Sequence, residues 1–179
     1  MAKVVSKVLG LAMDKTIELV AYDDFWLKVF AKEEAALAKL LRNNFIGCEH
    51  IGSTAMPNVL ARPTLDILCV VHTLDGIELF RNEFMAHGFS LVSNESQQFV
   101  FERKAPEGDR VLTNVKILKK GDERINDILD FRDYLNAEPM IATEYKNAKL
   151  NLVENHSNDL ALYEGMKQRF IEAVLSKIR

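Results

Sequence analysis

Hydrophobic positions recur every three or four residues in several parts of the chain. The first such part extends from Trp26 to Leu41 and has a charged opposite face, which predicts a helix packed on a core. Asp23 or Asp24 can cap its start, because a carboxylate accepts the unpaired backbone N–H groups there, and we expect the helix to run to about Asn43.

The same period predicts four more helices. Ile77 and Phe84 lie on one face of the second, and Gly88 is well placed to end it. From Asp122 onward the pattern is helical three times, and Ser157 or Asn158 is the expected cap of the last helix. The apolar faces of these three helices comprise Ile125, Ile128, Leu129 and Leu135; Ile141, Tyr145, Ala148 and Leu152; and Leu160, Tyr163, Phe170 and Val174.

Other apolar segments have the length of strands. Residues 65–71 are almost continuously apolar and predict a central strand, whereas residues 47–55 predict a strand or turn that enters a loop. Shorter signals predict strands at 17–20, 89–92, 98–104 and 110–119. Strands mixed with helices, followed by a helical tail, predict an α+β fold. We expect residues 1–16 to be an N-terminal extension and residues 17–179 to be one domain.

Composition narrows the classes of function. Lysine and arginine number 23 against 26 aspartates and glutamates, so the net charge is −3. A general nucleic-acid-binding domain would normally show a basic excess, which argues against that class but leaves room for a local basic pocket. No apolar run approaches the length of a membrane span, and the apolar stretch at 8–13 is short for a signal peptide, so we expect a cytoplasmic protein without a membrane partner. Cys48 and Cys69 read as small buried hydrophobes in a reducing compartment, with a disulfide as the alternative.

A turn of small residues and a lone carboxylate are the sharpest candidates for chemistry. Gly52-Ser53 can bring backbone N–H groups close to a phosphate, because no bulky side chain blocks the approach. Asp66 lies within an apolar strand, where an unpaired carboxylate is costly. Asp66 therefore has two alternative roles. It either takes part in function, by binding Mg²⁺ or orienting a hydroxyl, or it is a structural residue bonded to backbone amides or to Arg62.

This arrangement resembles the signature of the nucleotidyltransferase superfamily, in which Gly-Ser is followed by Asp-x-Asp on a strand. The chain departs from it at Leu68, which stands where the second carboxylate is expected and cannot bind a metal. A third acid would lie within 111–118, where the polar residues are Thr113, Asn114 and Lys116. The resemblance implies a metal site that is at best incomplete, and Mg²⁺ is a hypothesis with Asp66 as its one ligand. The alternative is that another acid, Glu49 or Glu102, comes close enough to Asp66 to replace the missing ligand.

A resemblance over nearly the whole chain after residue 16 is to the GrpB family. The matching strings are residues 18–26 (ELVAYDDFW), 49–57 (EHIGSTAMP), 62–68 (RPTLDIL) and 131–135 (FRDYL), followed by Glu144, Tyr145, Lys149, His156, Asp159, Tyr163 and Lys167. The resemblance implies a nucleotidyltransferase-like mixed sheet with flanking helices and a helical C-terminal part. Family members also occur fused to dephospho-coenzyme A kinase, which implies a nucleotide or coenzyme A context.

Two departures from the family pattern bear on the site. Members often carry a His-x-His pair where this chain has Asn114 and Lys116, which share one face of the expected strand. Lys116 could neutralise an anion there, or it could simply face water on an edge strand. The family's Lys-Pro before the aspartate is Arg62-Pro63 here, which keeps the charge but not necessarily its geometry.

Cations on the C-terminal helices are further candidates. Arg132 falls on the apolar stripe of its helix, so it either pairs with a buried acid such as Asp66 or points into an anion pocket. Helical spacing alone would make Tyr145 and Tyr163 core residues and would leave Lys149 and Lys167 on the surface. The family pattern instead implies that these side chains surround one pocket.

These observations predict that the chain is a nucleotidyltransferase-like protein that binds a phosphorylated small molecule, with a nucleotide as the first candidate. Any catalysis would be nucleotidyl or phosphoryl transfer through positioning and charge, with Asp66 as the catalytic residue. The alternatives are a non-catalytic binding module and an accessory protein that uses the fold as a surface for a partner. The candidate ligand-binding residues are His50, Gly52, Ser53, Thr54, Arg62, Asn114, Lys116, Arg132, Tyr145, Lys149 and Lys167.

Overall fold

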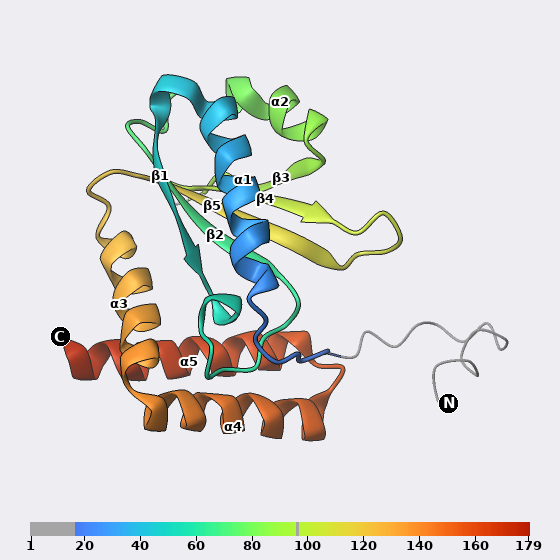
Figure 1. The fold of residues 1–179 in the computed structure, drawn as a ribbon, viewed down its shortest axis with the longest axis vertical. Helices are drawn as coiled ribbons and strands as arrows, with labels where there is room; N and C mark the ends of the chain where they lie inside the picture. The colour runs from blue at the N-terminus through green and yellow to red at the C-terminus, as the bar shows by residue number, and fades with distance from the viewer. Residues whose placement is uncertain (1–16, 96) are drawn as a thin grey trace, which may run out of the picture.

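A five-stranded mixed sheet forms the centre of the computed structural model, which describes residues 17–95 and 97–179 (Figure 1). In spatial order the strands are β1 (Phe45–Ile51), β2 (Leu65–Val71), β5 (Val111–Lys119), β4 (Phe99–Lys104) and β3 (Phe89–Ser93). The central pair, β2 and β5, is parallel, and each other neighbouring pair is antiparallel. This arrangement confirms the mixed sheet expected from the sequence.

Helices pack on both sides of this sheet. They are α1 (Phe25–Leu41), α2 (Arg81–Ala86), α3 (Glu123–Ala137), α4 (Pro139–His156) and α5 (Leu160–Ile178). Three short 3₁₀ helices occur in the connections, η1 (Arg42–Asn44), η2 (Ser53–Ala55) and η3 (Ile77–Phe80). Figure 1 shows α4 and α5 side by side below the sheet, with α3 near β1. The α+β class with flanking helices and a helical C-terminal part is thus confirmed.

Successive side chains of the central strands point alternately to the two faces of the sheet, an apolar face and a more polar one. Leu65, Ile67 and Cys69 belong to the core cluster that also contains α1 and α2 side chains. Asp66 lies between them in the sequence and therefore points to the opposite face. The register places Asp66 beside Asn114, and Asn114 beside Glu102 on β4. These three polar side chains consequently share the face directed away from α1.

Strand positions were predicted well and helix ends less so. The strands predicted at 65–71, 89–92, 98–104 and 110–119 are confirmed to within a residue or two. The strand predicted at 17–20 is wrong, because only Val20 pairs there, in an isolated bridge to Ala61. The first helix ends at Leu41 instead of Asn43, since the chain tightens into η1. The cap of α5 is Asp159, whose carboxylate accepts a 2.8 Å hydrogen bond from the backbone N–H of Leu162.

Three simpler expectations concern the cysteine thiols, a membrane span and the N-terminal extension. Cys48 and Cys69 face each other on β1 and β2 as free thiols, so the disulfide alternative does not apply. Among the described residues, none of the helices combines the length and apolar character needed to span a bilayer. The expected N-terminal extension, 1–16, lies outside the described residues.

Candidate functional site

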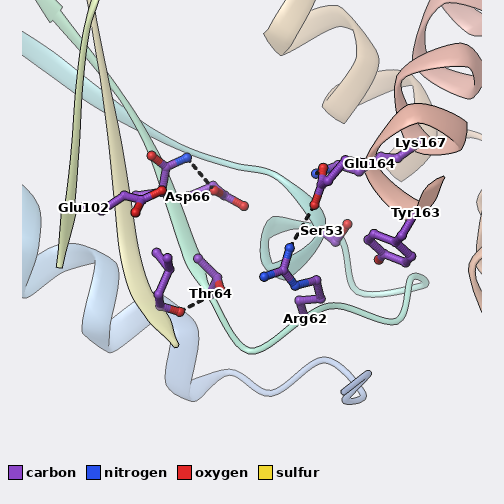
Figure 2. Close-up of a pocket in the computed structure, with 10 residues that line it drawn as sticks. Ser53, Arg62, Thr64, Asp66, Glu102, Tyr163, Glu164 and Lys167 are labelled. Carbon is purple, nitrogen blue, oxygen red and sulfur yellow. Dashed lines mark hydrogen bonds and ion pairs between the residues drawn. The ribbon is translucent and has the colours of Figure 1, made fainter. Parts of the chain in front are cut away.

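A cavity with a volume of about 250 Å³ opens on the polar face of the sheet (Figure 2). Its walls come from β2, β4, β5, the segment between β1 and β2, and α5. The lining residues are Ser53, Arg62, Thr64, Asp66, Glu102, Val111, Asn114, Tyr163, Glu164 and Lys167. Five of the residues selected from the sequence are therefore brought together here: Ser53, Arg62, Asp66, Asn114 and Lys167.

Gly52 allows the chain to turn directly against the Asp66 carboxylate. Its φ of +70° lies in a region that side-chain-bearing residues rarely adopt. A Cβ at this position would lie 2.4 Å from Oδ2 of Asp66 and 2.9 Å from its Cβ. The glycine thus meets two requirements, a positive φ and a close approach, and so places Ser53 at the edge of the cavity.

Asp66 is partly buried at the wall of the cavity. Its Oδ1 accepts a 3.1 Å hydrogen bond from Nδ2 of Asn114. Burial raises the pKa of the Asp66 carboxyl, although the Lys167 ammonium and the Asn114 hydrogen bond act in the opposite direction. The amide oxygen of Asn114, Oδ1, is buried and has no hydrogen-bond partner. A partly buried carboxylate beside an unsatisfied amide oxygen is costly to the fold, which is typical of a functional site.

Replacing Asp66 with asparagine is expected to raise the melting temperature at pH 7.5 by a few degrees. Folding raises the pKa of Asp66, so the folded state binds this proton more tightly than the unfolded state. The charged form therefore reduces stability as the pH rises from the ordinary aspartate value, about 4, through the raised value. The gain in the variant should disappear toward pH 4.

Thermal unfolding of both proteins at the two pH values measures this effect. Asp130→Asn, an exposed change on α3, is the matched control and should alter the melting temperature little at either pH. A melting temperature at pH 7.5 that is unchanged or lower in Asp66→Asn would contradict a burial cost for the carboxylate.

Two cations in the cavity converge on one carboxylate. Nη1 of Arg62 lies 2.8 Å from Oε1 of Glu164, and Nζ of Lys167 lies 3.2 Å from Oε2 of the same side chain. Figure 2 shows Arg62 and Glu164 facing each other, joined by a dashed line. Burial alone would lower the pKa of Lys167, but the carboxylates of Glu164 and Asp66 raise it above its ordinary value. Lys167 is therefore an ammonium at neutral pH.

A third cationic group lies behind the cavity. Lys149 on α4 is 1% exposed, and its Nζ donates hydrogen bonds to Oγ of Ser53, at 2.7 Å, and to the carbonyl of Leu60. Nζ also lies 4.3 Å from the centre of the Tyr145 ring. Burial lowers the pKa of Lys149 to about 7, and the positive charge of Lys167 contributes to the decrease. Lys149 can thus exist as either amine or ammonium near neutrality.

His50 and Thr54, predicted as ligand-binding residues, do not line this cavity. His50 lies on the α1 side of the sheet, where its ring stacks on Phe30 with the centroids 5.4 Å apart. Its Nε2 is 3.0 Å from Oγ1 of the buried Thr54, which donates to the carbonyl of Thr64. Burial, together with Arg132, lowers the pKa of His50 to about 4, so it is neutral. The pair supports the loop from the side away from the cavity.

Arg132 and Lys116 also lie outside the cavity lining. Arg132 donates to Glu49 at 2.8 Å, to Asp133 at 2.7 Å and to the carbonyl of His50 at 3.0 Å. Both acidic side chains are at least 45% exposed, so Arg132 pairs neither with Asp66 nor with another buried acid. Lys116 shares the sheet face of Asn114, and burial together with Arg124 lowers its pKa. The cation cluster expected from the sequence is thus divided, and Arg62, Lys149 and Lys167 are the members next to Ser53.

The side chains present do not fit a resident pair of Mg²⁺ ions. Leu68, on the same face of β2 as Asp66, is fully buried. Glu102 lines the cavity, but it comes from β4, with β5 between it and β2, and Glu49 is engaged by Arg132. Within 17–95 and 97–179, no three histidine, cysteine, aspartate or glutamate side chains group in a way that could hold a metal ion. We therefore assign no metal to this site.

Five lining residues are not among the ligand-binding candidates drawn from the sequence: Thr64, Glu102, Val111, Tyr163 and Glu164. Thr64 and Val111 are joined by a 2.9 Å hydrogen bond from the threonine hydroxyl to the valine carbonyl at the cavity wall. The sequence suggests Glu102 only as a replacement for the missing metal ligand, and Glu164 looks like an ordinary surface acid there. The one signal for Glu164 is its position three residues before Lys167 on a helix, a spacing that brings the two side chains together.

Comparison with known proteins gives one consistent family. The family described as GrpB protein matches residues 16–177. The glutamate-rich protein GrpB of Alkalihalophilus pseudofirmus is 29% identical over 176 residues, which cover 96% of this chain and 100% of that protein. UPF0157 protein YqkA of Bacillus subtilis is 28% identical over 167 residues, 92% of this chain and 48% of its own length.

Solved structures agree with this result. The crystal structure of the conserved protein GrpB from Enterococcus faecalis superposes with a TM-score of 0.80 at 28% identity, over 90% of this chain and 99% of its own. A cytoplasmic RNA terminal U-transferase gives a TM-score of 0.49 at 14% identity, which is too remote to bear on function. On the match to the family over residues 16–177, the chain belongs to the GrpB family.

Proposed function

We propose that the cavity binds a phosphorylated small molecule, with a nucleotide as the first candidate. The observation that carries the proposal is the convergence of Arg62 and Lys167 on the single carboxylate of Glu164 beside Ser53. The two cations come from distant parts of the chain, yet they are held where one anionic group contacts both. A phosphate could take the place of this carboxylate and accept the same charge-assisted hydrogen bonds.

The cavity dimensions favour recognition of the phosphorylated end of such a ligand. Pockets for whole drug-sized molecules measure about 300 to 1000 Å³, whereas this cavity is about 250 Å³. The remaining parts of a nucleotide would therefore extend through the opening. Asp66 and Glu102 also line the cavity and would repel further negative charge, so hydroxyl groups of the ligand are suitable partners for them.

Thermal unfolding in the presence of ligands tests the proposal. Pyrophosphate, ADP and ATP are expected to raise the melting temperature, and adenosine, which lacks phosphate, is not. Arg62→Met should abolish the shift, whereas Arg169→Met on the same helix as Lys167 should retain it. The absence of a shift with every phosphorylated compound would overturn the proposal and favour an accessory protein.

An assay of pyrophosphate release, with the protein and the same nucleotides, decides whether binding is accompanied by nucleotidyl transfer. Release of pyrophosphate from a nucleoside triphosphate that Asp66→Asn abolishes would assign transfer, while binding without release would assign a non-catalytic module. Measurements with and without Mg²⁺ test whether an ion delivered by the ligand's own phosphates uses Asp66, since Mg²⁺ is often held by one or two carboxylates together with substrate phosphates.

Replacing Glu164 with glutamine is expected to tighten pyrophosphate binding about tenfold, which corresponds to about 1.4 kcal/mol. The carboxylate competes with the ligand for Arg62 and Lys167, and a neutral amide competes less. Isothermal titration calorimetry measures the change. Glu172→Gln, an exposed change on α5, should leave the affinity unaltered. Weaker binding in Glu164→Gln would show instead that Glu164 contacts the ligand.

A further inference from the structure

A serine hydroxyl and a buried lysine amine are paired at the edge of the cavity. Oγ of Ser53 and Nζ of Lys149 are 2.7 Å apart, although the residues are 96 positions apart in the chain. Ser53 lines the cavity and can be reached by a bound molecule. Lys149 approaches from the protein interior with 1% of its surface exposed. This is the relative placement of a nucleophile and its general base.

Charged neighbours keep Lys149 close to the balance between amine and ammonium. Burial opposes its charged form, and Lys167 on α5 adds repulsion. Glu164 on α5 and Asp66 on β2 act in the opposite direction, and the Tyr145 ring lies against Nζ on the lysine's own helix. The resulting pKa of about 7 makes the amine available near neutrality, where a general base is most effective.

We propose that Ser53 and Lys149 form a serine–lysine dyad that catalyses acyl transfer from a carboxylic ester or thioester. Serine–lysine pairs are a known variant of the serine nucleophile and base arrangement in acyl transfer. This activity goes beyond anion binding, which requires only that the cations attract a phosphate. A phosphate group on the substrate would use Arg62 and Lys167, placing its ester carbonyl near Ser53.

The reaction divides into two balanced halves. Oγ of Ser53 attacks the carbonyl carbon while its proton moves to the neutral amine of Lys149. The bond to the alcohol or thiol then breaks, and the Lys149 ammonium returns the proton to that leaving group. In the second half, water attacks the acyl-serine, gives a proton to Lys149, and releases the carboxylic acid as Ser53 regains its hydrogen. No oxidant, reductant or further reactant is needed.

Negative charge that develops on the carbonyl oxygen has nearby positive groups. Arg62 and Lys167 line the same cavity as Ser53. The Tyr145 hydroxyl is close enough to Ser53 for their interaction to act on the pKa of Tyr145, which burial nevertheless raises above its ordinary value. Tyr145 therefore remains a protonated hydroxyl that can donate a hydrogen bond at neutral pH.

Labelling with a fluorophosphonate tests the dyad independently of the natural substrate. The activated serine forms an O–P bond as fluoride leaves, and peptide mass spectrometry locates the adduct. We expect labelling of Ser53, with a rate that rises with pH about a midpoint near 7, and none in Ser53→Ala. Lys149→Met should lower the rate by about 100-fold or more. Ser90→Ala on β3 and Lys146→Met on α4 are the matched controls.

Lys149→Arg separates catalysis from a structural role. Arginine retains charge and hydrogen-bond donors but cannot act as a base near neutrality. A Lys149→Arg protein that is folded by circular dichroism should lose labelling. Its melting temperature should fall, because a larger and permanently charged group is buried there. If it cannot fold, the pH dependence of labelling in the unaltered protein decides.

The outcomes are distinguishable from those of the binding proposal. Labelling that is absent, or equally fast in Lys149→Met, or independent of pH between 6 and 8, would overturn the dyad. Pyrophosphate could still raise the melting temperature in that case, and the binding proposal would stand alone. The reverse result, labelling of Ser53 without stabilisation by any phosphorylated compound, would retain the dyad and remove the anion subsite.

Discussion

Replacing Arg103 with methionine is expected to lower the free energy of unfolding by about 3 kcal/mol, the lower end of the range for breaking a buried ion pair. Arg103 on β4 donates to both carboxylate oxygens of Glu33, at 2.5 and 3.1 Å, and to Oγ1 of Thr113 at 3.0 Å. Its guanidinium carbon lies 4.8 Å from the centre of the Phe89 ring. Glu33 is 6% exposed, so the variant would leave its carboxylate buried without this partner. Because the Arg103 side chain is 28% exposed, water reduces the loss.

Urea denaturation of a double-mutant cycle with Glu33→Leu measures this contribution. The double variant should recover much of the stability, because two apolar side chains remove the isolated charge. Lys104→Met is the matched control, since Lys104 is the next residue on β4 and is exposed. A loss below about 1 kcal/mol in Arg103→Met would indicate an ion pair no stronger than those on protein surfaces.

Replacing Gly52 with alanine is expected to cost about 2 to 5 kcal/mol and to weaken pyrophosphate binding. The backbone conformation, with φ +70° and ψ −173°, is essentially restricted to glycine and costs about 1 to 3 kcal/mol for other residues. The overlap of the new Cβ with Asp66 adds an overpacking cost of about 1 to 3 kcal/mol. Relief of this overlap would move η2, and Ser53 with it.

Gly108→Ala separates the cost of the backbone conformation from the cost of the overlap with Asp66. Gly108, in the turn between β4 and β5, has a φ of +97°, and an added Cβ there would have no neighbour within 4 Å. It should therefore show the backbone cost alone and leave pyrophosphate binding intact. A double variant, Gly52→Ala with Asp66→Ala, should recover part of the overlap cost. Equal losses in the two glycine variants would contradict a role for the close approach to Asp66.

Local patterns predicted the strands and helices because the folded chain alternates between buried and exposed positions at fixed periods. The almost continuous apolar run at 65–71 has the length and composition of a buried strand, and it is β2. Where single side-chain interactions compete over one or two residues, the prediction failed. Asp159, instead of Ser157 or Asn158, caps α5, because its carboxylate reaches the N–H of Leu162.

Part of the candidate site was also predictable. Gly52, Ser53 and Asp66 stand out because small residues and a carboxylate in apolar surroundings need a specific reason. His50 was predicted for the same site because it is adjacent in sequence, but alternation along β1 directs it to α1. Proximity in sequence therefore does not determine the face of a sheet on which a side chain lies.

The sequence by itself determined the α+β class, the succession of helices and strands along the chain after residue 24, and the glycine and aspartate around which the cavity is built. Only the tertiary structure decided which cations come near the cavity, since the packing of α4 and α5 below the sheet brings Lys149 to Ser53 and places Lys167 in the cavity wall. It also directed Arg132 to Glu49 and placed Glu164 between Arg62 and Lys167. The physical reason is that apolar periodicity is local, whereas the pairing of charges depends on which buried faces meet.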